Sequence, residues 1–349
     1  MALLRADNFG WQTAAQLARL YTTVDDGSGS ILVGSYGRAS APGIRFSGDA
    51  AAYIREAMTV YVPSGAVAII QADLRISAAP AAVTALFRIM DGSTVQATLA
   101  IGTDRKLQVY RGDLTTALGS ASTYVVPVNT FISIGLQLTI DGSAGGAIVH
   151  VWGPGDTSAQ VVLNLTAQNT DAASSGAWDG YDVHAGSAGN TDWANLIVAD
   201  GDAGINDALF GPADVSPRRP VDDSLGEWSP STGLVHAAMV DDSTADDDVT
   251  YVQAAAANKS ELYECQDLVD PSQTLFGVVV ARVAKIVSGS PTVGGLSQEE
   301  PDTPEDGGTL PFGSSYSTIV EPMDYTPDGN DWTPAIFNAS QFGIKVVSL

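Results

Sequence analysis

Strand-like runs that end in Asp-Gly dipeptides constrain the fold of this chain more than any other feature. Alternating apolar runs stop at Asp91-Gly92, at Asp141-Gly142 and at Asp200-Gly201. Asp-Gly favours tight turns and hairpins, because glycine accepts backbone angles that other residues avoid. Short strand candidates, Met58–Val62 among them, recur between such turns, and no long window shows a sustained helical period. The pattern predicts an all-β protein of the sandwich or jelly-roll type.

The chain divides at a proline-containing stretch. Its 349 residues exceed what one typical core holds. After the strand-like run that ends at Asp200-Gly201, an apolar pair at Leu209-Phe210 is followed by glycine and three prolines. Proline fixes its own φ and cannot donate to a sheet, so such a run ends one packed unit. We therefore predict two β-sandwich domains, a jelly roll over 1–205 and a smaller sandwich over 221–349, joined by a linker over 206–220.

Several finer features of the fold follow from local patterns. Helical turns are expected only within Gln12–Leu20 and Trp332–Phe337. The long apolar run Ala66–Ile76 predicts a central strand covered on both faces. Leu275–Val287 gives the strongest signal for a buried strand, and the Gly-, Pro- and acid-rich stretch Ser288–Thr309 predicts a long exposed loop.

Charge limits the classes of partner. The formal net charge is −24, so phosphate backbones and anionic membrane surfaces should be repelled. No apolar run reaches the ~18 residues that a membrane-spanning helix needs. The residues that follow Met1 do not resemble a secretory signal, so we expect folding in a cytoplasm. The single cysteine, Cys265, excludes an intrachain disulfide and is interpreted as a small core residue.

Catalytic signatures are not found in the sequence. The three histidines, His150, His184 and His236, do not stand at metal-ligand spacing from one another. We find no Gly-x-Ser-x-Gly elbow, no His-Glu-x-x-His motif, no phosphate loop and no paired-glutamate strand motif of the jelly-roll glucanases. The sequence therefore predicts a protein that is not an enzyme.

Calcium is the only cofactor for which the sequence offers ligands. Asp25 and Asp26 lie in one turn, and Asp246 and Asp247 lie in an acidic loop. Carboxylates in loops suit calcium, but neither pair has EF-hand spacing. We interpret all four as solvated turn residues, with calcium binding as the alternative, and predict no bound metal.

Glycan binding has the best physical case among the recognition functions. Sugars stack on aromatic rings and hydrogen-bond to polar side chains, and Trp178, Asp179 and Tyr181 share one short loop-like stretch. The competing interpretation makes Trp178 a core residue, since large aromatic side chains dominate burial. We favour the core interpretation and keep these residues as candidate glycan contacts.

A resemblance to a known group of proteins begins at the junction. The motifs that carry it are Trp193–Val198, Leu209-Phe-Gly, Pro220-Val-Asp-Asp, Trp228-Ser-Pro-Ser-Thr-Gly, Asp248-Val-Thr-Tyr-Val, Trp332-Thr-Pro-Ala and Asn338–Lys345. This pattern resembles virion proteins of tailed bacteriophages. The N-terminal half is similar to concanavalin/laminin-G-type jelly rolls, with Tyr110-Arg-Gly and Trp193 in familiar places.

The resemblance implies a structural or accessory protein of the phage particle. Such a protein would lie in the tail, at its tip or fibre, or decorate the capsid surface, and would be a homo-oligomer that contacts other virion proteins. It would be located in the virion and made in the host cytoplasm. The alternative is a receptor-binding, lectin-like module that recognises host-cell glycans, and a polysaccharide-degrading enzyme is a more distant third.

Overall fold

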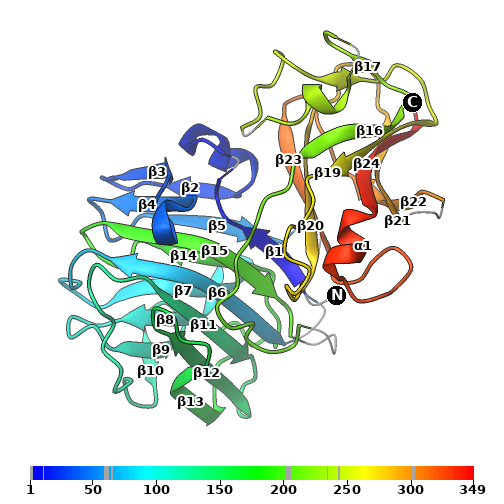
Figure 1. The fold of residues 1–349 in the computed structure, drawn as a ribbon. Helices are drawn as coiled ribbons and strands as arrows, with labels where there is room; N and C mark the ends of the chain where they lie inside the picture. The colour runs from blue at the N-terminus through cyan, green and yellow to red at the C-terminus, as the bar shows by residue number, and fades with distance from the viewer. Residues whose placement is uncertain are drawn as a thin grey trace. The chain divides into compact units, whose positions relative to one another are not determined.

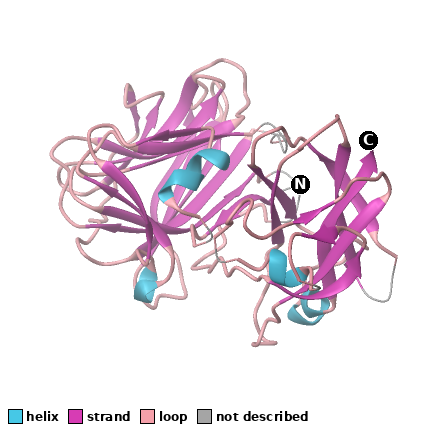
Figure 2. Ribbon diagram, turned by 90° about the horizontal axis from the view of Figure 1, so that it is seen from above, coloured by secondary structure: helices cyan, strands magenta, loops and turns pink. Residues whose placement is uncertain are grey.

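Strands are the predominant secondary structure in the computed structural model, and helical segments are few and short (Figure 2). The structure describes residues 3–10, 12–58, 63, 66–201, 206–233, 235–242, 244–299 and 303–349. The strand expected at Met58–Val62 therefore falls mostly outside the described residues. Two compact units, Met1–Val215 and Ser216–Leu349, divide the chain. Their boundary lies inside the stretch 206–220 that the sequence predicts as a linker. The all-β prediction is confirmed.

Two antiparallel sheets form the first unit (Figure 1). An eight-stranded sheet has the order β13-β12-β11-β6-β15-β4-β3, with β1 added beside β15. Its strands are β1 (Leu3–Asp7), β3 (Ser30–Gly34), β4 (Gly43–Ser47), β6 (Val67–Ile76), β11 (Ile132–Thr139), β12 (Gly145–Trp152), β13 (Gln160–Gln168) and β15 (Thr191–Ala199). A seven-stranded sheet has the order β10-β9-β8-β7-β14-β5-β2. Its strands are β2 (Thr23–Asp25), β5 (Tyr53–Ala57), β7 (Thr84–Asp91), β8 (Thr94–Ile101), β9 (Leu107–Arg111), β10 (Thr116–Leu118) and β14 (Gly180–His184).

The two sheets are joined by an aromatic core. Trp193 of β15 is fully buried and its ring lies 4.9 Å from that of Phe87 on β7. The indole Nε1 donates to the carbonyl of His184 on β14, at 2.8 Å. One side chain thus packs against the facing sheet and satisfies its own polar atom there. β6 lies between β11 and β15 and is buried along most of its length, which confirms the predicted central strand.

The stretch that follows β15 is fixed to the outer face of the eight-stranded sheet. The backbone N–H of Phe210 donates to Gln71 Oε1 at 3.1 Å, and the Gln71 amide donates to the Gly211 carbonyl. The N–H of Val215 donates to Asn195 Oδ1 at 3.0 Å. The first half of the predicted linker is therefore held against the sheet by side-chain hydrogen bonds that its sequence alone does not reveal.

The second unit is a smaller sandwich. A five-stranded sheet has the order β16-β19-β24-β21-β22, and a two-stranded ribbon pairs β20 with β23. The strands are β16 (Pro220–Gly226), β17 (Ser229–Pro230), β18 (Val252–Gln253), β19 (Lys259–Cys265), β20 (Val278–Ala284), β21 (Thr292–Glu299), β22 (Glu305–Leu310), β23 (Ser317–Met323) and β24 (Ser340–Ser348). Arg282 of the ribbon donates to the Gly343 carbonyl of the sheet at 2.6 Å and forms an ion pair with Glu321. Apolar side chains of both layers complete the core.

Two predictions about this unit are wrong. Ser288–Thr309 contains the paired strands β21 and β22 instead of a long loop. Two of its glycines lie under the Glu321 carboxylate: a Cβ at Gly295 would come within 2.6 Å of that side chain, and one at Gly307 within 2.7 Å. The run Leu275–Val287 does contain β20, but this strand is mostly half-buried, because it forms one edge of a two-stranded ribbon.

The helical segments lie close to the predicted positions. The 3₁₀ helix η1 spans Ala14–Arg19, within the expected Gln12–Leu20, and α1 spans Pro334–Asn338, overlapping the expected turn. Two further 3₁₀ turns, η2 (Arg38–Ser40) and η3 (Ala237–Met239), were not predicted. Each is too short to show a hydrophobic period.

Replacing Trp193 by alanine should destabilise the first unit by about 3–5 kcal/mol, because a fully buried aromatic ring is lost between the sheets. Urea unfolding followed by tryptophan fluorescence and circular dichroism measures the change. The control is Val161→Ala on β13, where the side chain is 56% exposed and the cost should be within about 0.5 kcal/mol. Equal losses in the two variants would contradict the assigned core.

Candidate functional site

The residues proposed for glycan contact are used for packing. Trp178 is 2% exposed and Tyr181 is fully buried, so neither ring offers a face to a sugar. The Trp178 indole donates to the Val67 carbonyl at 3.3 Å. Asp179 accepts a hydrogen bond from the backbone N–H of Gly92 at 2.8 Å, which holds the β7–β8 turn. The core interpretation therefore describes these residues, and the glycan interpretation of Trp178 and Tyr181 does not fit the structure.

The calcium candidates cap turns. Asp25 accepts from the N–H of Gly27 at 2.9 Å. Asp246 accepts from the N–H and the hydroxyl of Thr250, at 3.1 and 2.9 Å. Asp26 and Asp247 are not brought into a cluster with other carboxylates: within the described ranges, no group of three or more His, Cys, Asp or Glu side chains could hold a metal ion.

Two histidines lie beside carboxylates that already serve other partners. His184 is buried on the outer face of the seven-stranded sheet, 3.6 Å from Asp182, and its burial lowers its pKa. The Asp182 carboxylate accepts hydrogen bonds from Arg55 Nε at 2.6 Å and from Arg55 Nη2 at 2.7 Å. In the second unit His236 contacts Glu261, whose other oxygen accepts from the N–H of Trp228 at 2.8 Å. These carboxylates tie neighbouring strands and turns together.

The outer face of the eight-stranded sheet carries a second ion-pair group. Asp192 on β15 accepts from Arg45 on β4 at 2.6 Å and from Arg75 on β6 at 2.7 Å. The Arg45 guanidinium lies 4.3 Å from the Tyr36 ring centroid, and that of Arg75 lies 4.6 Å from the Phe131 ring centroid. Three strands are thereby linked, and partly exposed aromatic rings lie next to hydrogen-bonding groups.

A polar network lies inside the first unit near β1. Asp7 accepts from the Tyr21 hydroxyl at 2.9 Å, and Arg5 lies 3.5 Å from the same carboxylate. Buried side-chain atoms of Arg5, Glu56 and Tyr181 have no hydrogen-bond partner among the residues that the structure describes. Burial raises the pKa of Glu56 to about 7, against the opposing effect of Arg5. This network makes the stability of the first unit depend on pH.

The edge strand β13 differs from this charged pattern. Among the described strands it pairs only with β12, and most of its nine residues are exposed or half-buried. None of them is charged and none is proline. Two bulges, between Gly145/Ala147 and between Val149/His150 of the partner strand, increase its twist. Because unpaired strand edges are templates for pairing with another chain, an uncharged edge of this length is a candidate docking element.

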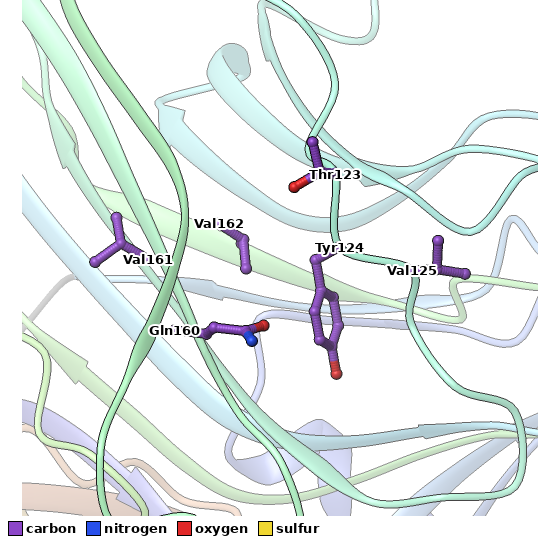
Figure 3. A pocket seen from close by; sticks show the side chains of 6 residues that line it. All are labelled: Thr123, Tyr124, Val125, Gln160, Val161 and Val162. Carbon is purple, nitrogen blue, oxygen red and sulfur yellow. The ribbon is translucent and has the colours of Figure 1, made fainter.

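A shallow pocket of about 390 Å³ lies beside this edge (Figure 3). Its lining comes from the start of β13 and from the loop after β10: Thr123, Tyr124, Val125, Gln160, Val161 and Val162. Gln160 and Tyr124 point toward one another across it. Valines around it are strongly exposed, Val161 at 56% and Val125 at 40%. The result is an uncharged surface in which exposed valines lie beside hydrogen-bonding groups.

Local contacts hold the pocket wall in place. The N–H of Ser122 donates to the Leu107 carbonyl at 2.8 Å, and the N–H of Val126 donates to the Arg105 carbonyl at 2.9 Å, which fixes the loop to the start of β9. Leu165 of β13 lies over Gly119, where a Cβ would come within 2.6 Å of it. The loop and the strand are therefore in direct contact.

The sequence carries a signal for this surface that motif analysis misses. Residues 114–170, which include β10 to β13, contain only two charged residues, Asp141 and Asp156. The whole chain has 16 basic and 40 acidic residues. Part of this segment is buried in β11 and β12, and its exposed part at β13 and Thr123–Val125 forms a surface with few charges in an acidic protein.

Comparisons with known proteins leave the function open. No family model matches the chain and no curated protein matches it. Among solved structures, the catalytic domain of a glycoside hydrolase family 131 protein from Coprinopsis cinerea is 14% identical, with a TM-score of 0.35 over 62% of this chain and 98% of that one. A protein of unknown function from Shewanella oneidensis MR-1 is 16% identical, with a TM-score of 0.34 over 55% and 80%.

Trypanosoma rangeli sialidase is 13% identical, with a TM-score of 0.30 over 49% of this chain, which spans only 27% of the sialidase. Likenesses at this level carry no argument about activity.

None of the helices in the described part of the chain has the length and apolar character that crossing a bilayer requires.

Glu56→Gln should flatten the dependence of stability on pH. In the folded state the pKa of Glu56 is about 7 against an ordinary 4.5, so folding takes up a proton between these values. Stability contributed by this group is therefore lost as pH rises from about 4.5 to about 7. The melting temperature of the variant minus that of the parent should increase between pH 5 and pH 8. Glu305→Gln, at an exposed site, is the control, and a difference that stays constant with pH would contradict the account.

Proposed function

We propose that this protein is a structural or accessory component of a tailed-bacteriophage particle, and that it acts by assembly in the tail or on the capsid surface. The observation that carries the proposal is the uncharged β13 edge, which has no strand partner on its outer side in the described part of the chain and lies beside an uncharged pocket, in a chain of net charge −24. The sequence resemblance at the junction supports the same class of protein.

The distribution of charge explains why such a surface would serve assembly. Acidic faces keep copies of the chain apart, and only a patch with few charges allows close approach without a large electrostatic cost. Exposed valines supply apolar area there, and free backbone groups of β13 supply hydrogen bonds. The clustered ionisable residues described above are engaged in links between strands, which suits a rigid building block.

Val161→Lys should weaken self-association of the purified chain. Val161 is 56% exposed, so lysine is accommodated in the monomer, but its charge would have to be desolvated in a contact. Light scattering during size-exclusion chromatography should show the parent at a multiple of 36.0 kDa and the variant shifted toward that mass. Val161→Thr is the matched control. A parent chain that stays monomeric at all concentrations, and is missing from purified particles by mass spectrometry, would contradict the proposal.

A second candidate function is recognition of host-cell glycans, favoured by the outer face of the eight-stranded sheet. There Tyr36 and Phe131 are partly exposed beside the Arg45–Asp192–Arg75 group. Aromatic rings next to fixed polar groups are the elements from which saccharide sites are built.

The glycan function predicts saturable binding to a defined saccharide on a glycan array, lost on Tyr36→Ala and kept in Val161→Lys. The tyrosine ring is the stacking surface, whereas Val161 belongs to the β13 edge on another side of the unit. Binding that is unaffected by Tyr36→Ala, or no binding to any saccharide, would exclude this face as a glycan site.

A further inference from the structure

We propose that β13 pairs antiparallel with β13 of a second copy of this chain, across a two-fold axis that passes beside Asn164. The inference rests on the proposed assembly function and names its partner and register. It joins the two eight-stranded sheets edge to edge, so that the outer strand of each finds the hydrogen-bonding partner it lacks.

The sequence of β13 is self-complementary in this register. In an antiparallel pair centred on Asn164, Leu163 of one copy opposes Leu165 of the other, and Gln160 opposes Gln168. Asn164 of one copy opposes Asn164 of the other. The two carboxamides can hydrogen-bond to each other, because each can both donate and accept. The pairs farther out, Val162 with Thr166 and Val161 with Ala167, lie at the two bulges, and Ala167 has a φ of 54°, so Leu163–Leu165 define the register.

The side chains of β13 point in directions that suit this pairing. Asn164 is exposed, whereas Leu163 is buried and Leu165 is half-buried against Gly119. The asparagines would meet on the outer face, and the leucines would extend the core across the new sheet contact. The bulges of β13 lie outside Leu163–Leu165, so the central residues keep regular pairing geometry.

Other sheet edges in the described part of the chain are shorter or carry residues that oppose pairing. β2 and β10 have three residues each, and β3 has five. In the second unit, β16 contains Pro220 and two aspartates, and β22 begins with Glu305-Asp306. Charges, proline, short length and bulges are the devices that keep strand edges from pairing. β13 has two bulges, but it has no charge and no proline, and its nine residues make it longer than these other edges.

Charge selects a second copy as the partner. A basic partner would be drawn to the acidic faces of this chain, and an uncharged edge gives it no advantage. A second copy is equally acidic, so the electrostatic repulsion between the two chains is smallest where charges are sparse. Residues 114–170 contain only two charged residues, Asp141 and Asp156. A two-fold contact of this kind is self-complementary and can also be one interface within a larger dihedral assembly.

Disulfide trapping tests the register directly. With Cys265→Ser as background, Asn164→Cys supplies the only thiol. Opposed residues in an antiparallel pair have Cα atoms about 4.5–5.5 Å apart, within the range that a disulfide spans. Mild oxidation should therefore convert most of the full-length chain to a dimer on a non-reducing gel.

Thr166→Cys in the same background is the control. In the proposed register, position 166 of one copy lies four residues, about 13 Å, along the strands from position 166 of the other. The two thiols are then too far apart to form a disulfide, so this variant should give little dimer. Thr166 is exposed like Asn164, so collision between free monomers would trap both variants equally. Equal trapping of the two variants would therefore overturn the inference.

Charge exchange provides the second test. Asn164→Lys and Asn164→Glu each place like charges opposite one another and should raise the dimer dissociation constant about fivefold or more. Mixing the two variants should restore association, measured by sedimentation velocity. Self-association of the parent, with neither trapping of the Asn164→Cys variant nor rescue on mixing, would overturn the β13 contact while leaving the assembly function in place. A chain that is monomeric throughout would contradict both.

Discussion

Backbone hydrogen bonding is the constraint on which this protein depends. Nearly every buried N–H and C=O must find a partner, and an all-β chain meets this need by laying strands side by side. The central strands β6 and β15 are paired on both sides, and side chains such as Trp193 then join the two sheets. Strand pairing ends at the outer strands of each sheet, which include β13 and β3 in the eight-stranded sheet. The charge, proline content and length of these outer strands determine whether the protein remains monomeric or assembles.

The chain handles its charges in two ways. Aspartates and arginines on the outer sheet faces are paired across strands, as in Arg45–Asp192–Arg75 and Arg55–Asp182, so they stiffen the sheets. Most other acidic residues give the surface its strong negative charge. Against this background the charge-poor side formed by β13 and the loop at Thr123–Val125 is the exception, and the assembly proposal follows from that contrast.

The sequence predicts those features that local chemistry determines. Asp-Gly turns, alternating runs and the long apolar run of β6 identify the strands, and the burial of Trp178 agrees with the preference of large aromatics for the core. Pairing partners are not local. The hairpin of β21 and β22 does not follow from local patterns, because the Glu321 carboxylate that lies over Gly295 and Gly307 comes from another strand. The β13 edge was missed for the same reason, since no local pattern shows which strand is outermost.

Amide hydrogen exchange as a function of protein concentration tests the central claim most directly. If β13 is the contact between copies, amides in Gln160–Gln168 should exchange more slowly as the concentration rises into the range of self-association, while those of the edge strand β3 should not change. Exchange in β13 that is independent of concentration, in a sample shown to associate, would contradict the account.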